Sequence, residues 1–226
     1  SEMCIRDSQY IILANLLDAS DFGTFAIAML ALETLEAFSQ MGLSTALIYK
    51  QDDIRTFLNT VWSIQILRGL ILGGLLILSA PWIAQFFNEP SAVYIIQAAG
   101  IPPIINGFLN VGIIYFEKDL QFQRDFLFRF LGSLIGLPIG IVLAFMLRNA
   151  WALAISMIVG SVIQVINSYI FHPYRPRFHI DYAKAKELNL YGRWIFGSKI
   201  MKYILARGDA IIVGKLLGTL ELGYYK

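Results

Sequence analysis

The stretch Phe22–Tyr49 constrains the fold of this chain more than any other feature of the sequence. It is long enough to cross a bilayer, because about 20 apolar residues suffice at a rise of 1.5 Å each. Yet it carries Glu33, Glu36 and Gln40, spaced by three and four residues, so all three lie on one face of a helix. An ionised group at mid-membrane costs about 2.5–3.5 kcal/mol unless it faces protein or water. The stripe therefore predicts either a water-filled transport cavity or a packing seam sealed by hydrogen bonds to neighbouring helices.

The composition places the whole chain in a membrane. Of its 226 residues 57% are hydrophobic and 15% charged, whereas a soluble domain is about half apolar and a quarter charged. We therefore expect an all-α polytopic membrane protein. The net charge of +2 does not favour nucleic acid as a partner. The single cysteine, Cys4, excludes a cysteine-based metal site, and no phosphate loop or nucleophile elbow is present. We expect no catalytic residues, no metal and no cofactor.

Apolar runs predict the remaining spanning helices. After the second half of a first helix, they cover residues 57–80, 93–116, 126–147, 150–171 and 195–217. The resulting organisation is an uninformative remnant at residues 1–8, a first six-helix bundle over 9–171, an amphipathic loop over 172–194, and over 195–226 a seventh helix that begins a second bundle. The loop is expected to become helical from Asp181, which is a good N-cap residue.

Three local signals refine these helices. Pro81 and Trp82 predict an interfacial elbow that continues through residues 86–90. The Pro102-Pro103 pair predicts a kink, because adjacent prolines remove two backbone donors. Glycines at 132, 136 and 140, spaced by four, predict that another helix approaches this ridge closely.

The basic residues of the loops set the predicted topology. Nine lie in the turns after the second, fourth and sixth helices, and only Arg148 lies in the other turns; the nine are Lys50, Arg55, Lys118, Arg124, Arg175, Arg177, Lys184, Lys186 and Arg193. The first group is therefore predicted to be cytoplasmic, with a cytoplasmic N-terminus.

An internal repeat is also predicted. Residues 16–25 (LLDASDFGTF) align with residues 216–225 (LLGTLELGYY) at an offset of 200 residues. The offset spans six predicted helices, so both copies have the same orientation, as in the parallel repeats of secondary transporters.

Six short segments give the sequence a family resemblance. They are residues 21–25 (DFGTF), 42–48 (GLSTALI), 86–90 (FFNEP), 175–178 (RPRF), 209–218 (DAIIVGKLLG) and 222–225 (LGYY). In their order and spacing the chain resembles bacterial polysaccharide repeat-unit flippases of the O-antigen, colanic-acid and teichuronic-acid exporter type. That family belongs to the multidrug/oligosaccharidyl-lipid/polysaccharide exporter superfamily.

The resemblance implies two six-helix bundles around a cavity that opens alternately to either side of the bacterial inner membrane. It also implies that a monomer moves oligosaccharides linked to undecaprenyl pyrophosphate from the cytoplasmic to the outer leaflet. Relative to this pattern, the chain is expected to be an N-terminal-half fragment, without the start of the first helix and most of the second bundle.

Charged residues inside the spans are the candidate site. At 1.5 Å per residue, Glu33, Arg68 and Arg207 lie about 17–18 Å from the ends of their predicted helices, near the midplane. The predicted substrate-binding or cavity residues are Arg68, Arg207, Lys199, Lys202 and Gln40, with the cations attracting the pyrophosphate. The residues expected to balance these charges, or to exchange a coupling proton or sodium ion, are Glu33, Glu36 and Asp209.

Other interpretations remain open at this stage. Arg129, Lys199 and Lys202 lie near the predicted cytoplasmic mouth, where long cationic side chains also snorkel to lipid phosphates. A cation-coupled multidrug antiporter would use Glu33, Glu36 and Asp209 as its cation site. A membrane enzyme acting on polyprenyl-linked sugars would need paired acids in a surface loop, where the sequence offers only Asp52-Asp53.

Overall fold

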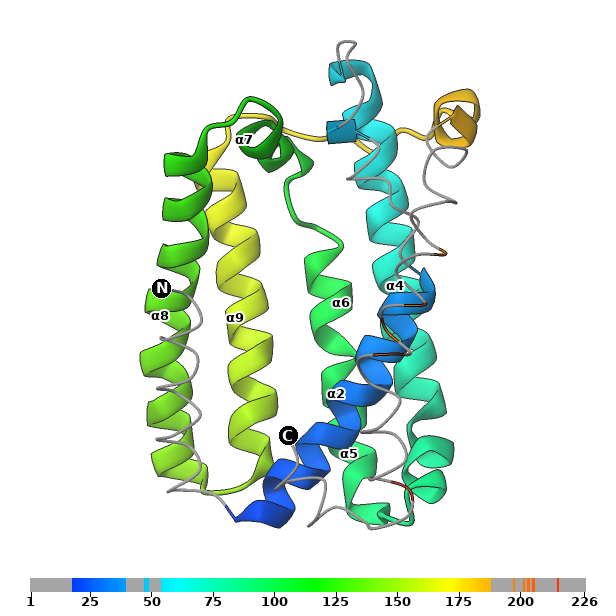
Figure 1. The fold of residues 1–226 in the computed structure, drawn as a ribbon, viewed down its shortest axis with the longest axis vertical. Helices are drawn as coiled ribbons and strands as arrows, with labels where there is room; N and C mark the ends of the chain where they lie inside the picture. Colours follow the sequence, from blue (N-terminus) through cyan, green and yellow to red (C-terminus); the bar gives the residue numbers. More distant parts are fainter. Residues whose placement is uncertain are drawn as a thin grey trace.

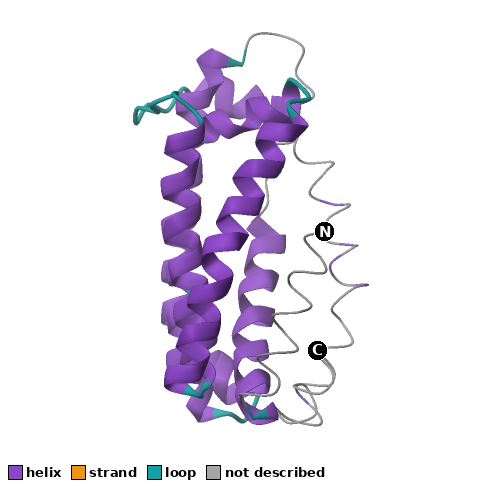
Figure 2. Cartoon of the chain, turned by 90° about the vertical axis from the view of Figure 1, so that its left-hand side faces the viewer, coloured by secondary structure: helices purple, strands orange, loops and turns teal. Residues whose placement is uncertain are grey.

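The computed structural model describes residues 18–39, 47–48 and 54–187, together with positions 197, 201, 203, 205 and 215. In this part of the chain the regular structure is entirely helical, and the long helices stand side by side in a bundle (Figures 1 and 2). Four described helices are long and apolar enough to cross a membrane, or five if a bent pair counts as one span. The prediction of an all-α polytopic membrane protein is confirmed. The predicted first helix lies outside the described residues.

The helices follow one another with short connections. They are α2 (Ala19–Ser39), α4 (Arg55–Phe86), α5 (Val93–Ala99), α6 (Ile101–Asn106), α7 (Ile114–Lys118), α8 (Phe122–Leu147) and α9 (Ala150–Phe171), with single 3₁₀ turns at Pro90–Ala92 and Val111–Ile113. Helix α9 has the predicted bounds, and α8 begins four residues earlier than predicted.

Helix α2 crosses the bundle diagonally and packs against α4, α5 and α9 (Figure 1). Its contact face is built from small and branched apolar residues, including Ala26, Ile27 and Leu30, which are buried in the main core. Its first turn is tied to the first turn of α9, because the carboxylate of Asp21 accepts a hydrogen bond from the backbone N–H of Ala150 (3.1 Å). Its other end reaches the middle of α4 (Figure 1).

Helix α4 is longer than predicted and runs through Pro81 without an elbow. The predicted elbow is therefore confirmed only in its second part, residues 86–90, where the helix ends and the chain turns. At Pro81-Trp82 the helix continues, with Ala80 and Ala84 on either side of the proline buried in the core. The helix ends at Phe86. Asn88 follows in the left-handed conformation (φ 56°), which asparagine tolerates better than most residues.

The fourth predicted span is interrupted twice, once next to its prolines and once further along the chain. Pro102 and Pro103 lie at the start of α6, where a missing N–H is not needed for the helical ladder. The helix is interrupted at Gly100, directly before the two prolines, where the kink is predicted. The sharpest bend, 72° between Pro90–Asn106 and Val111–Lys118, follows at residues 107–110 and was not predicted.

Close helix contact occurs on a different glycine pair from the predicted one. A Cβ atom at Gly69 would overlap the carbonyl oxygen of Pro103, and one at Gly73 would overlap the carbonyl oxygen of Gly100. Helix α4 therefore approaches α5 and α6 through a Gly-x3-Gly motif. By contrast, a Cβ at Gly132 or Gly136 would meet no described atom within 4 Å, so these two members of the predicted ridge make no close contact within the described part of the chain, whereas Gly140 is buried.

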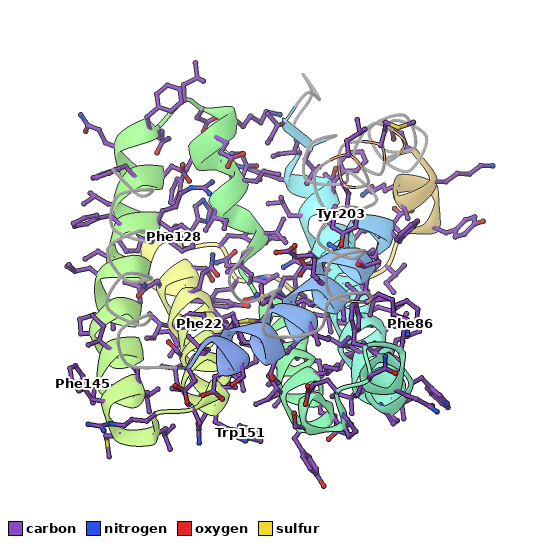
Figure 3. All side chains as sticks on the ribbon, turned by 60° about the horizontal axis from the view of Figure 1, so that its bottom comes forward. Phe22, Phe86, Phe128, Phe145, Trp151 and Tyr203 are labelled. Carbon is purple, nitrogen blue, oxygen red and sulfur yellow. The ribbon has the colours of Figure 1, made fainter. Side chains whose placement is uncertain are left out.

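The outer faces of the long helices are apolar. Leu78 on α4 and Met146 on α8 are more than 70% exposed, and the ring of Phe145 points away from the bundle (Figure 3). Exposed apolar side chains over full helical lengths match a lipid-facing surface.

Most of the described basic loop residues lie at one end of the bundle. This basic end contains the start of α4, helix α7, the start of α8 and residues 172–187, whereas Arg148 lies in the α8–α9 turn at the opposite end (Figure 1). The two groups of basic loop residues distinguished in the sequence therefore lie at opposite ends of the structure.

An extended segment, His172–Asp181, crosses the basic end from α9 to α4 (Figure 1); we call it the strap. The Oδ1 atom of Asn59 accepts hydrogen bonds from the hydroxyl of Tyr174 (2.7 Å) and from the backbone N–H of Arg177 (2.8 Å). One turn further along α4, Ser63 Oγ accepts a hydrogen bond from the backbone N–H of His179 (2.9 Å). These contacts hold the strap against the first turns of α4.

The strap ends in the helical turn predicted from Asp181. Residues 182–187 are helical, and Asp181 Oδ1 accepts hydrogen bonds from the backbone N–H groups of Ala183 (3.0 Å) and Lys184 (3.3 Å). These hydrogen bonds, with the nearby Lys184 ammonium, hold the pKa of the Asp181 carboxyl below its usual value. The predicted N-cap is confirmed.

Candidate functional site

The acidic stripe of α2 lies in its last two turns. The side chains of Glu33 and Glu36 are half-buried there. Between them, the hydroxyl of Thr34 lies 2.6 Å from the hydroxyl of Tyr203, which also donates to the carbonyl oxygen of Leu30 (3.3 Å). Tyr203 belongs to the predicted seventh helix and lies beside α2 and α4 (Figure 3). Tyr203 therefore touches the same part of α2 that carries the two carboxylates.

Arg68 of α4 meets the end of this stripe. Its Nε atom donates a hydrogen bond to Ser39 Oγ (3.0 Å), and Ser39 Oγ donates to the carbonyl oxygen of Glu36 (3.0 Å). The Glu36 carboxylate lies within electrostatic range of the guanidinium. Helix α4 thus brings a cation to the acidic face of α2. We call Glu33, Glu36, Ser39 and Arg68 the charged cluster.

The charged cluster lies far from both ends of α4. At 1.5 Å per residue, Arg68 is about 20 Å from the Arg55 end and about 27 Å from the Phe86 end. A hydrocarbon core is about 30 Å thick, so Arg68 cannot easily reach either surface. A charge at such a depth is stabilised only by protein partners or by water.

The polar face of α4 continues toward the basic end. Three residues before Arg68, the amide of Gln65 donates to the carbonyl oxygen of Asn106 (2.8 Å). Tyr169 donates to the carbonyl oxygen of Phe108 (3.0 Å), and Ser168 accepts from the backbone N–H of Asn110 (3.0 Å). These side chains satisfy the backbone groups freed where the fourth span breaks. Irregular backbone inside a membrane protein requires such partners.

The structure places only part of the predicted site. Glu33, Glu36 and Arg68 come together, whereas Gln40, Lys199, Lys202, Arg207 and Asp209 lie outside the described residues. The direct pairing of Glu33 with Arg68 stays a prediction, since the hydrogen bond described for Arg68 goes to Ser39.

Arg129 takes part in an ion-pair network between α7 and α8. Its guanidinium contacts Glu117 (2.7 Å) and Asp125 (2.9 Å). The sequence left open that the Arg129 guanidinium binds lipid phosphates. In the structure it binds protein carboxylates.

Sequence reasoning missed Ser39 and the strap contacts. Ser39 extends the acidic stripe at a spacing of three from Glu36, which is a usable signal. Asn59 and Ser63 lie four residues apart on α4 and mark the face that receives the strap. Their partners are more than 110 residues away, so the sequence offered no means of naming them.

No group of three or more His, Cys, Asp or Glu residues is placed to hold a metal ion within the described residues. The site consists of charges and of hydrogen-bond donors and acceptors inside membrane-spanning helices.

The sequence model of one protein family matches residues 12–226, which is nearly the whole chain; its description is "Polysaccharide biosynthesis protein". The chain belongs to this polysaccharide biosynthesis protein family. The family resemblance stated from the six sequence segments is thereby confirmed.

Individual members of the family are distant from this chain. The succinoglycan biosynthesis transport protein ExoT of Rhizobium meliloti (strain 1021) is 23% identical over 95% of the chain and 43% of its own length. The lipopolysaccharide biosynthesis protein WzxC of Escherichia coli (strain K12) is 19% identical over 96% of the chain and 44% of its length. The teichuronic acid biosynthesis protein TuaB of Bacillus subtilis (strain 168) is 23% identical over 100% of the chain and 48% of its length.

The chain therefore spans less than half the length of these relatives. No solved structure matches it significantly. The family match and the spanning helices give the coarse conclusion, a multi-pass membrane protein of a polysaccharide biosynthesis family.

Proposed function

We propose that this chain forms one lobe of a flippase for oligosaccharide repeat units linked to undecaprenyl pyrophosphate. In this proposal the complete protein moves the repeat unit from the cytoplasmic to the outer leaflet by alternating access. The two lobes would be related by the repeat between residues 16–25 and 216–225. The names of the three relatives support the polysaccharide part of the proposal.

The observation that carries the transport part is the charged cluster. A helix that only anchored the protein would gain nothing from Glu36 and Arg68 at mid-span, because each charge is costly in hydrocarbon. In the proposal Arg68 attracts the anionic pyrophosphate as it passes, and the α2 carboxylates balance the cation between transport events. Arginine suits this role because its planar guanidinium can bind phosphate oxygens in pairs.

The seventh helix completes the proposed substrate path. Tyr203 contacts Thr34, so the predicted cations Lys199, Lys202 and Arg207 belong to a segment that reaches the face of α2 carrying the cluster. We propose that these cations add to the attraction of Arg68, while Gln40 lines the path. Asp209 would take part with Glu33 and Glu36 in exchanging a proton or sodium ion.

Orientation is part of the proposal, with the basic end in the cytoplasm. Single cysteines at Lys118 and Lys184 should react with an impermeant maleimide only from the cytoplasmic side, and one at Ser91 only from outside, in a full-length protein with Cys4 replaced by serine. Periplasmic labelling at Lys184 in intact cells would reverse the orientation.

The function is tested with the full-length protein purified into vesicles that contain a fluorescent undecaprenyl-pyrophosphate oligosaccharide. Arg68→Gln should lower the initial rate of translocation at least tenfold, and Arg68→Lys should retain more of it because the positive charge remains. Gly74→Ala on the same helix is a matched control, since a Cβ there meets no described atom within 4 Å.

The drug-antiporter alternative gives the opposite result in the same vesicles. It predicts ion-driven uptake of a cationic dye that depends on Glu36, with no movement of the glycolipid. Glycolipid translocation equal to wild type in Arg68→Gln would remove the charged cluster from the proposed path.

A double-substitution cycle tests the pairing within the cluster. Removing one partner of a buried pair leaves an uncompensated charge, which is usually worse than removing both. Glu33→Gln and Arg68→Gln should each reduce translocation, and the double variant should lose less than the product of the two effects. Strictly multiplicative losses would mean that the two side chains do not interact.

A further inference from the structure

A pocket of about 590 Å³ lies at the basic end, away from the charged cluster. It is enclosed by the start of α4, the α7–α8 connection and the start of the strap. Its lining residues are Arg55, Leu58, Tyr115, Phe116, Asp119, Gln121, Arg124, His172, Pro173 and Tyr174. Its volume is in the range of small-molecule and cofactor sites, and nothing in the proposed translocation step uses it.

The lining is suited to an anion. Arg55 and Arg124 bring two guanidinium groups to the pocket, against the single carboxylate of Asp119. Such a pair of planar donors matches the oxygens of a phosphate group. The net positive charge and the excess of hydrogen-bond donors favour a phosphorylated ligand over a neutral sugar.

His172 adds a further donor. Its Nδ1 atom accepts a hydrogen bond from the backbone N–H of Tyr174 (3.2 Å), so the neutral ring carries its proton on Nε2. The ring stacks on Tyr115 with 5.8 Å between ring centroids. Burial, and then the charges of Arg124 and Arg175, lower the pKa of His172, which keeps the ring neutral near pH 7.

The pocket lies beside apolar side chains at the level where a spanning helix begins. Leu120 and Phe122 are 67% and 68% exposed, and they alternate with the lining residues Asp119 and Gln121. Leu120 adopts a left-handed backbone conformation (φ 53°), which is rare for a bulky residue. Strained turns of this kind occur most often at functional sites.

From this juxtaposition we propose that the pocket binds the phosphate groups of a lipid headgroup at the basic end. Arg55 and Arg124 bind the phosphate oxygens, Gln121 and His172 supply further hydrogen bonds, and the acyl or prenyl chain lies along Leu120 and Phe122. The same chemistry fits the pyrophosphate of a polyprenyl carrier and the phosphate of an anionic phospholipid. If the polyprenyl carrier is the ligand, it docks in the pocket before translocation. This docking role rests on the proposed function.

The test measures binding without transport. The full-length protein in detergent is titrated separately with undecaprenyl pyrophosphate, phosphatidylglycerol and zwitterionic phosphatidylcholine, and native mass spectrometry counts bound lipids. Arg55→Gln and Arg124→Gln should each weaken binding of the preferred phosphorylated lipid about fivefold, as expected for the loss of one charge-assisted contact. Arg124→Lys, which keeps the positive charge but loses the planar pair of donors, should weaken binding less than Arg124→Gln does.

Arg177→Gln is the matched control, because it removes one positive charge from the same end outside the pocket lining. Selective loss of undecaprenyl pyrophosphate binding identifies the carrier as the ligand, and loss of phosphatidylglycerol binding identifies a structural or regulatory phospholipid. Equal effects of Arg177→Gln and Arg124→Gln, or no effect of either pocket arginine on any lipid, would overturn the proposal.

Failure of this inference is distinguishable from failure of the proposed function. If the pocket variants bind every lipid as the wild type does, while the wild-type protein translocates the glycolipid, the proposed function is supported and the proposed lipid site is refuted. If the protein binds phospholipid through Arg55 and Arg124 but translocates no glycolipid, the lipid site is supported and the proposed function is refuted. Arg124 is exposed, so Arg124→Gln does not disturb the core and remains an interpretable variant.

Discussion

Replacing Asn110 by alanine should release the strap from the break in the fourth span. This asparagine is fully buried. Its Nδ2 atom donates to the carbonyl oxygens of Tyr174 (2.8 Å) and His172 (3.3 Å), and its Oδ1 atom accepts from the backbone N–H of Gly112 (2.9 Å). One side chain therefore joins the start of the α7 region to the start of the strap.

The magnitude follows from these partners. The carbonyl oxygens of His172 and Tyr174 keep a second donor, since the Arg175 guanidinium contacts both (2.9 and 3.1 Å). The buried N–H of Gly112 has no such substitute among the hydrogen bonds described, and leaving it unsatisfied costs about 1–3 kcal/mol. With the two weaker losses, the free energy of unfolding should fall by about 2–4 kcal/mol.

The assay combines a global and a local readout on the full-length protein. Unfolding in mixed micelles with increasing dodecyl sulfate gives the change in free energy, and hydrogen–deuterium exchange followed by mass spectrometry reports on peptides within 172–181. Asn106→Ala is the matched control, because the Oδ1 atom of Asn106 has no hydrogen-bond partner among the described residues; it should cost less than about 1 kcal/mol. Faster exchange in the strap of Asn110→Ala alone would support the reasoning. Equal stability and equal exchange in the two variants would refute it.

Two further predictions test the helix contact and the pocket histidine. Gly73→Ala should destabilise the protein by about 1–3 kcal/mol in the same micelle assay, because the added methyl group forces α4 away from α5 and α6. Gly74→Ala, with open space around its Cβ, should be neutral or slightly stabilising. Equal effects of the two substitutions would contradict the tight contact at Gly73. Because burial and then Arg124 and Arg175 lower the pKa of His172, its contribution to stability should be complete above about pH 6.5 and diminish as the pH falls from there through the folded-state pKa. Arg124→Gln should raise this pKa in a ring-NMR titration, and an unchanged or lower value would argue against the arginine as a cause.

The strap gives a physical picture of how the two predicted bundles are connected. It runs from α9 to the first turns of α4 and is held by side chains of α4 that are otherwise buried, including Thr60 and Ser63. A connection that is hydrogen-bonded to the first bundle moves with that bundle. In the rocking motion proposed for alternating access, residues 172–181 would then move together with the first bundle.

The sequence determined much of the architecture because the bilayer imposes strong constraints. A span must be apolar for about 20 residues and must satisfy its own backbone, so the bounds of α9 and the approximate positions of α2, α4 and α8 could be predicted. The asymmetry of the basic loop residues could also be predicted, and it coincides with the two ends of the structure. Glu33, Glu36 and Arg68 stood out because ionised residues are rare inside spans.

Tertiary structure decided what depends on partners far apart in the chain. A proline predicts the loss of a hydrogen bond but not where the chain bends most. The helix is interrupted next to Pro102-Pro103, yet the sharpest bend lies at residues 107–110, where Asn110 and other side chains satisfy the backbone. A glycine motif predicts that close approach is possible but not which helix will come near, so Gly69 and Gly73 form the contact and Gly132 does not. Arg68 meets Ser39 because α2 crosses the bundle diagonally, and that crossing follows from packing of the whole core rather than from any local pattern.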